Sequence, residues 1–86
     1  MDKEEIINAI NQFLVHEFEI DEKKLSPDCN LKDDLGLESL DFVDIAVMIK
    51  KRYGIKLKGR DVISVKNLGD LYGLIYDRLQ RQQVSV

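Results

Sequence analysis

One short stretch of this chain places a serine, a glycine and several carboxylates close together: Asp-Asp-Leu-Gly-Leu-Glu-Ser-Leu-Asp at residues 33–41. Gly36 can adopt backbone angles that other residues avoid, which suits a sharp reversal just before Ser39. A serine at the start of a helix is exposed, and the unpaired amides there favour a negative group attached to it. The stretch therefore suits a phosphodiester bonded to Ser39, with nearby carboxylates that a modifying enzyme could recognise.

A simpler interpretation of the same residues is that Ser39 only caps the helix that follows it, as serines commonly do. Glu38 and Asp41 place negative charge at the same helix N-terminus, where such charge is stabilising. The local chemistry leaves both interpretations open.

Two other kinds of site fit the sequence poorly. Ser39 lacks the trailing glycine of a Gly-x-Ser-x-Gly turn, and the single histidine, His16, falls on the polar side of its helix, so a hydrolase is not favoured. A calcium loop counted from Asp28 has Asp33 where glycine is needed and Ser39 where glutamate is needed. Cys29 is the only cysteine, which excludes an internal disulfide. We therefore expect no catalytic residues and no metal site.

Hydrophobic periodicity predicts helices on both sides of the serine stretch. In chain order, the predicted elements are a helix over residues 3–18, a long loop over 21–37, a helix from 39 to about 53, one helical turn within 59–65 and a last helix over 68–80. Asp2 is placed to open the first helix, and Gly54 to end the second. Residues 81–86 show no pattern and should fray. The expected fold is an all-α, small four-helix bundle with three main helices and one short helix, forming a single domain over residues 1–86.

Apolar side chains from all of these helices are expected to form one core. The predicted core residues are Ile6, Ile10, Phe13, Ile45, Ala46, Ile49, Leu57, Val62, Val65, Leu71 and Ile75. Leu25, Leu31 and Leu35 are spaced through the loop as anchors into this core. The polar side chains of the first helix, Asn11 and His16 among them, should face water.

The second helix carries a further apolar pair outside its core face. At about 100° per residue, Leu40 and Val47 fall nearly opposite the core-facing residues, beside Asp44 and Lys51. An apolar pair framed by charges is typical of a surface that docks a partner protein.

The motif at residues 33–41 closely resembles the attachment motif of acyl carrier proteins, Asp-Asp-Leu-Gly-x-[Asp or Glu]-Ser-Leu-Asp, in which the serine carries 4′-phosphopantetheine. The order of the predicted helices is also similar to that family, over about residues 6–79. The resemblance implies that Ser39 holds a covalent 4′-phosphopantetheine arm. The residues that flank it in the motif are Gly36, Glu38, Leu40 and Asp41.

The same resemblance implies a carrier rather than an enzyme. Such a carrier holds acyl intermediates as thioesters on its arm and presents them to enzymes of fatty-acid, polyketide or related biosynthesis. The implied partners are a phosphopantetheinyl transferase and acyl-transferring, ketosynthase or ligase-type enzymes, which would dock at Leu40, Asp44, Val47 and Lys51. The alternative is a helical protein-interaction adaptor in which Ser39 stays unmodified.

The sequence departs from the family pattern at the end of the second helix. Lys50, Lys51 and Arg52 occupy positions that are acidic in the best-known members, and Lys58-Gly59 replaces a typical proline–acid pair. Bases at a helix C-terminus also offset the helix dipole, so their meaning is open. These departures bear on the choice of partner enzymes rather than on the arm.

The composition excludes some classes of partner. The chain has 86 residues and a formal net charge of −3, whereas a nucleic-acid surface needs a basic excess. No apolar run approaches membrane-spanning length, and the first residues are charged rather than signal-like. We expect a cytoplasmic monomer with no nucleic-acid partner and no membrane insertion.

Overall fold

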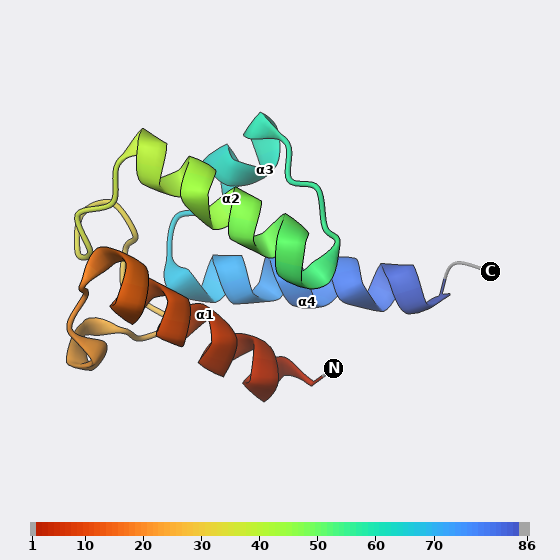
Figure 1. The fold of residues 1–86 in the computed structure, drawn as a ribbon, viewed down its shortest axis with the longest axis horizontal. Helices are drawn as coiled ribbons and strands as arrows, with labels where there is room; N and C mark the ends of the chain where they lie inside the picture. Colours follow the sequence, from red (N-terminus) through yellow and green to blue (C-terminus); the bar gives the residue numbers. More distant parts are fainter. Residues whose placement is uncertain (1, 85–86) are drawn as a thin grey trace.

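The computed structural model describes residues 2–84, which form an all-α bundle (Figure 1). Its helices are α1 (Lys3–Phe18), α2 (Ser39–Tyr53), the short α3 (Gly59–Ser64) and α4 (Leu68–Val84), with a 3-10 turn, η1 (Glu22–Lys24), in the loop between α1 and α2. Three main helices and one short helix confirm the predicted fold class. None of the helices within residues 2–84 is long and apolar enough to cross a membrane.

The helix boundaries agree with the predicted ones except at the end of α4. The carboxylate of Asp2 accepts the N–H of Glu5 at 2.9 Å, and Gly54 ends α2 with a φ of 71°. The prediction that the chain frays from residue 81 was wrong for residues 81–84, because α4 continues to Val84. This segment holds good helix formers and no breaker, and Arg81 pairs with Asp77 one turn earlier at 3.1 Å. Residues 85–86 lie outside the described residues.

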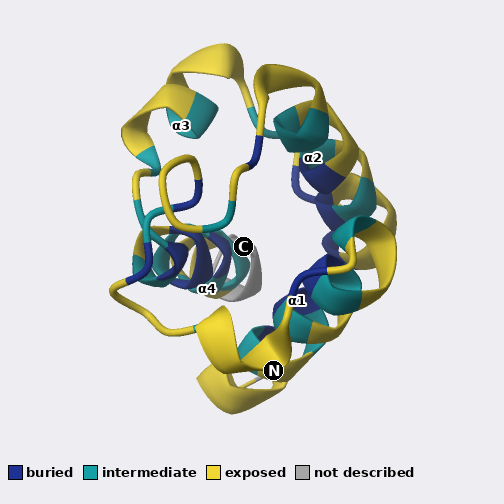
Figure 2. Cartoon of the chain, turned by 90° about the vertical axis from the view of Figure 1, so that its left-hand side faces the viewer, coloured by how far each residue is buried: buried dark blue, intermediate teal, exposed yellow. Residues whose placement is uncertain are grey.

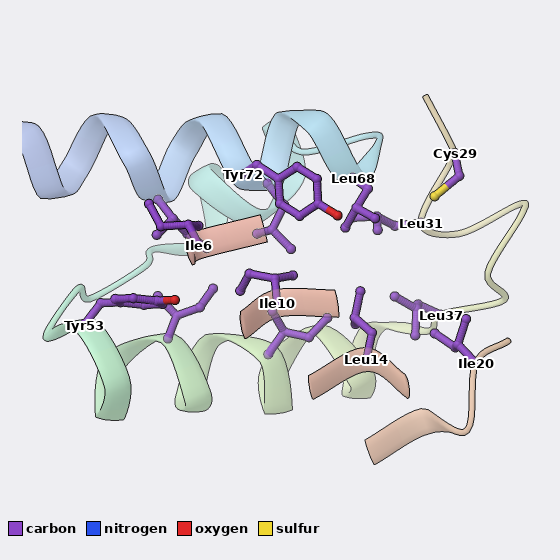
Figure 3. Close-up of a cluster of buried hydrophobic side chains, with 14 of the residues drawn as sticks. Ile6, Ile10, Leu14, Ile20, Cys29, Leu31, Leu37, Tyr53, Leu68 and Tyr72 are labelled. Carbon is purple, nitrogen blue, oxygen red and sulfur yellow. The ribbon is translucent and has the colours of Figure 1, made fainter. Parts of the chain in front are cut away.

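The core is enclosed by α1, α2 and α4. Ile6, Ile10 and Leu14 of α1 are fully buried, and Figure 3 shows them between α2 and α4. Of the predicted core residues, those that are buried are Ile6, Ile10, Ile45, Ile49, Leu71 and Ile75.

The other predicted core residues are only partly buried: Phe13, Ala46, Leu57, Val62 and Val65. For Val62 and Ala46 the reason lies in α3, which has no buried residue (Figure 2). Both residues line a groove between α2 and α3. The core is completed by further buried residues, among them Leu31, which was predicted as a loop anchor. They are Leu14, Ile20, Cys29, Leu31, Leu37, Tyr53, Ile55, Leu68 and Tyr72.

Tyr72 of α4 also corrects the prediction that Asn11 faces water. Its hydroxyl donates a hydrogen bond to the side-chain oxygen of Asn11, and this bond joins α4 to α1. Burial raises the pKa of Tyr72 to about 12, so the hydroxyl stays protonated and can donate. His16 is exposed, as predicted.

The long loop is attached to the start of α4 by backbone hydrogen bonds. The N–H of Leu68 donates to the carbonyl oxygen of Cys29 at 3.0 Å, and the N–H of Gly69 donates to that of Pro27 at 2.8 Å. A Cβ at position 69 would lie 3.0 Å from this Pro27 oxygen, so a larger residue there would push the loop away from α4 by a few tenths of an ångström. Of the predicted loop anchors, Leu31 is buried, whereas Leu25 and Leu35 are half-buried.

Candidate functional site

The loop that precedes Ser39 is folded by its own polar side chains. The side-chain oxygen of Asn30 accepts the N–H groups of Lys32 and Asp33, at 2.9 and 2.8 Å. The carboxylate of Asp34 accepts the N–H of Asn30 at 2.6 Å. Gly36 then reverses the chain with a φ of 70°, a region in which residues with a Cβ are strained. Asn30 and the first residues of the motif therefore fix the path by which the chain enters α2.

The start of α2 is capped without using Ser39. Glu38 is the N-cap, with extended angles, and Ser39 is the first helical residue. The carboxylate of Asp41 accepts the N–H of Glu38 at 2.9 Å. The interpretation of Ser39 as the helix cap is therefore wrong. The Ser39 side chain is exposed, and its hydroxyl has no hydrogen-bond partner among residues 2–84.

The carboxylates around Ser39 shape the backbone rather than gather at one point. Asp34 and Asp41 each accept a backbone N–H, as described above. Within residues 2–84, no group of three acidic, histidine or cysteine side chains is placed to hold a metal ion. Of the other reactive side chains, His16 is exposed on α1 and Cys29 is buried in the core.

Ser39 lies between two grooves that meet at α3. The first groove, between α2 and α3, has a volume of about 490 Å³ and is lined largely by apolar side chains. The second, of about 410 Å³, lies toward the loop that precedes Ser39. The residues that line both grooves are Ser39, Phe42, Val62 and Ile63. A flexible group attached to the Ser39 hydroxyl could therefore reach apolar surface directly beside its attachment point.

This position also fits a negatively charged group bonded to Ser39. The first amides of a helix have no partner within the helix and carry partial positive charge, which favours an anion there. An exposed hydroxyl, an anion-favouring helix start and an apolar groove together fit a phosphate-linked arm with a long substituent.

The predicted docking residues are all exposed, but they do not line one groove. Leu40 is 77% exposed and Val47 is 48% exposed. Asp44, Val47 and Lys51 line a third groove, of about 540 Å³, between α2 and the end of α1. Val47 also lines the groove between α2 and α3, so it stands on the ridge between these two grooves.

Two further exposed apolar residues were missed by the sequence analysis. Val43 is 57% exposed and lies one helical turn after Leu40, so helical spacing could have found it. Ile63 is 73% exposed on α3, and its place beside α2 depends on tertiary packing that no local pattern reveals. Leu40, Val43, Val47 and Ile63 are the large apolar side chains classed as exposed among the described residues, and we call them the apolar strip.

Comparison with known proteins agrees with these features. The family model described as the phosphopantetheine attachment site matches residues 5–75. An acyl carrier protein of Thermotoga maritima is 29% identical over 77 residues, which are 90% of this chain and 95% of that protein. Acyl carrier protein 2 of Ralstonia nicotianae is 30% identical over 79 residues, 92% of this chain and 98% of that protein.

A third acyl carrier protein is also similar. The meromycolate extension acyl carrier protein of Mycobacterium tuberculosis is 32% identical over 73 residues, which cover 85% of this chain and 64% of that protein. The family match spans α2, its preceding loop and most of the bundle. The chain therefore belongs to the family of acyl carrier proteins, and phosphopantetheine is its cofactor.

Proposed function

We propose that this chain carries acyl groups on a 4′-phosphopantetheine arm bonded to Ser39 and presents them to biosynthetic enzymes without catalysing their reactions. The arm supplies a thiol on which acyl groups are held as thioesters. The chain itself supplies the attachment point, shelter for the acyl group and a surface for docking. Fatty-acid, polyketide or related biosynthesis is the proposed setting.

The observation that carries this proposal is the state of the Ser39 hydroxyl. It is exposed at the first residue of α2 and makes no hydrogen bond among residues 2–84, so modifying it disrupts no contact. The acceptor at the helix N-terminus is Asp41 instead. If the Ser39 hydroxyl capped α2, its modification would remove the cap and destabilise the helix. Because the hydroxyl makes no such bond, the modification carries no such cost.

The groove between α2 and α3 supports the carrier role. Phe42 and Val62 face this groove next to Ser39, and both are only partly buried. An acyl chain placed there would bury apolar surface at about 0.8 kcal/mol for each methylene group. The groove can therefore shelter the cargo between deliveries, while the covalent link keeps its local concentration high.

The apolar strip supports docking on the same side of the molecule. Its side chains lie exposed among charged residues, which is the usual arrangement of an interface core within a polar rim. We propose that partner enzymes, including a phosphopantetheinyl transferase, contact this strip together with Asp44 and Lys51. A surface beside Ser39 would bring the arm to the partner's active site.

Intact-mass measurement tests the attachment residue. The purified chain, incubated with coenzyme A and a promiscuous phosphopantetheinyl transferase, should gain one phosphopantetheinyl group, and Ser39→Ala should gain none. Ser26→Ala is a matched control, because Ser26 is also exposed, and it should load like the wild type.

Two results would contradict the proposal. Loading that persists in Ser39→Ala would place the arm on another residue. A wild-type chain that never accepts the arm would instead favour the adaptor interpretation, in which the same helical surface binds proteins and Ser39 stays unmodified.

A further inference from the structure

The face formed by α2 and α3 is positively charged at the end distant from Ser39. Lys50, Lys56 and Lys58 line the groove between α2 and α3, Lys51 and Arg52 beside them turn toward α1, and Arg60 lies on α3. All six are exposed. The whole chain has a formal net charge of −3, so this local sign is opposite to that of the molecule. The opposition calls for a local explanation.

The helix dipole explains only part of this cluster. Lys50, Lys51 and Arg52 lie in the last turn of α2, where positive charge offsets the dipole. Lys56 and Lys58 come after Gly54, which ends the helix, and the dipole effect fades beyond the last turn. Stabilisation of α2 therefore does not account for these two lysines.

Lys50, Lys56 and Lys58 form no ion pair with the chain's own acids within residues 2–84. The ion pairs found within the described residues are Arg78 with Asp61 and Arg81 with Asp77. Both involve α4, and neither contains a lysine of the cluster. The ammonium groups are thus free to meet charges from another molecule.

The groove between α2 and α3 differs in charge from the other two grooves. Its charged lining residues are Lys50, Lys56 and Lys58, with no acid among them. The groove toward α1 mixes Glu17 and Asp44 with bases, and the groove toward the loop contains Asp33 beside lysines. A concave apolar surface with charges of one sign concentrates the electric field and attracts the opposite charge.

The opposite end of the same face is acidic. Glu38, the N-cap of α2, and Asp41, in its first turn, flank Ser39, and Asp44 lies one turn later on the side of α2 that faces α1. Lys50 follows Ser39 by eleven residues, which is about 16 Å along a helix axis. The apolar strip runs between these ends, so the docking face has an apolar centre with acidic residues at one end and basic residues at the other.

We infer that the enzymes which receive cargo from this carrier present an acidic surface to Lys50, Lys56 and Lys58. The inference rests on the proposed function, because it concerns the partners that dock on α2. An acidic patch at this end attracts the lysines, whereas an enzyme that is basic along its whole docking surface is repelled there. The separation of acidic and basic residues along α2 thus fixes the orientation in which a partner docks. It also excludes partners that require acidic residues along the whole of this helix.

A binding experiment with two matched charge reversals tests the inference. Lys56→Glu/Lys58→Glu reverses two cations beside the groove and outside α2. Lys23→Glu/Lys24→Glu changes the net charge equally at exposed positions in η1, away from α3 (Figure 1). Each variant is loaded with the arm and titrated, at low and high salt, against a condensing enzyme that accepts acyl groups from the wild-type carrier.

At low salt, the Lys56→Glu/Lys58→Glu pair should weaken binding about tenfold, and high salt should shrink the difference. The control pair should change the Kd by less than about twofold. Lys56→Gln/Lys58→Gln should give an intermediate loss, because it removes attraction without adding repulsion.

Three outcomes would overturn the inference. Equal losses of affinity in the two charge-reversed variants would show that only the net charge of the carrier matters. No loss of affinity in either variant would show that the partner does not contact the lysines. A loss seen only when the arm carries an acyl group with a terminal carboxylate would assign the lysines to the cargo. Failure of the wild type to accept the arm, read by intact mass beforehand, would refute the proposed function instead.

Discussion

α2 lies between two regions that are packed in different ways. On its inner side, Ile45 and Ile49 are buried against α1 and α4 and are at most 3% exposed. On its outer side, Val43 and Val47 are about half exposed and line the groove toward α3. In Figure 2 the buried residues follow the inner sides of α1, α2 and α4, whereas α3 is coloured as exposed or intermediate.

The two regions are also held by different forces. The region between α1 and α4 is held mainly by burial of aliphatic side chains. α3 is held to α4 by the Arg78–Asp61 ion pair, with a nitrogen–oxygen distance of 2.7 Å. The other carboxylate oxygen of Asp61 accepts the N–H of Lys58 at 2.9 Å, so this one side chain both caps α3 and links it to α4.

This difference shows how a small bundle can combine stability with access. Aliphatic packing does not depend on pH, but the loss of a single buried side chain costs much of its stability. A site that binds a cargo or a partner is therefore better placed in a less tightly packed region. Ser39 and the two grooves that it lines are on the α3 side. Changes in the inner region should therefore unfold the chain, and changes on the α3 side should alter access and binding.

The largest effect is expected from truncating the inner face of α2. Ile49→Ala should lower the free energy of unfolding by about 2–5 kcal/mol, because Ile49 is fully buried and its loss leaves a cavity. Val47→Ala, two residues earlier, should change it by no more than about 0.5 kcal/mol and should instead weaken partner turnover. Urea denaturation of both variants checks this contrast. Similar losses of stability in the two variants would mean that the two faces of α2 are not packed differently.

A smaller, local effect is expected from Asp61. The N–H of Lys58 lowers the pKa of Asp61 below its usual 3.8, burial of the carboxyl opposes this shift, and the Arg78 guanidinium adds to it. The charged form therefore stabilises the folded state above pH 3.8, and this contribution is lost as the pH falls through the lowered pKa. In that acidic range, the protection factors of α3 amides in the wild type, which correct for the slower intrinsic exchange at low pH, should fall.

Variants separate this local link from global stability. In Asp61→Asn, the α3 amides should exchange faster at neutral pH, and their protection should no longer change with acid. The amides of α1 should remain protected. Arg78→Gln should give a weaker form of the same change, because the N–H of Lys58 still binds Asp61. If α1 and α3 accelerate together in Asp61→Asn, the two regions do not open separately.

The inner region was more predictable from sequence than the α3 side. Ile6 and Ile10 in α1, and Ile75 in α4, each belong to an apolar stripe with helical spacing, so periodicity places them in the core. Leu31 is buried in the long loop as predicted, but Leu37 and Ile55 are buried where periodicity gives no signal. Their positions depend on how the loops close over the helices.

The α3 side depends on tertiary geometry, which one sequence does not encode locally. Val62 was predicted in the core because it is apolar, but α3 stands away from α2 and leaves it lining a groove. The motif revealed Ser39 as the candidate attachment residue, yet it did not reveal that Glu38 is the N-cap. A serine and an acid are both common at a helix start, and the backbone angles decide between them.

The smallest effect on stability is expected at Ser39 itself. It tests whether the Ser39 hydroxyl can be modified without destabilising the fold. Ser39→Ala should change the free energy of unfolding by no more than about 0.5 kcal/mol, because its hydroxyl makes no hydrogen bond among residues 2–84 and the N-cap is Glu38. Asp41→Ala should cost about 1 kcal/mol, since it removes the acceptor of the Glu38 N–H and a negative charge at the helix start. Thermal denaturation of the unloaded chains measures both. A Ser39→Ala variant that is as destabilised as Asp41→Ala would show that the hydroxyl supports the helix start, and modification of Ser39 would then cost part of the stability of α2.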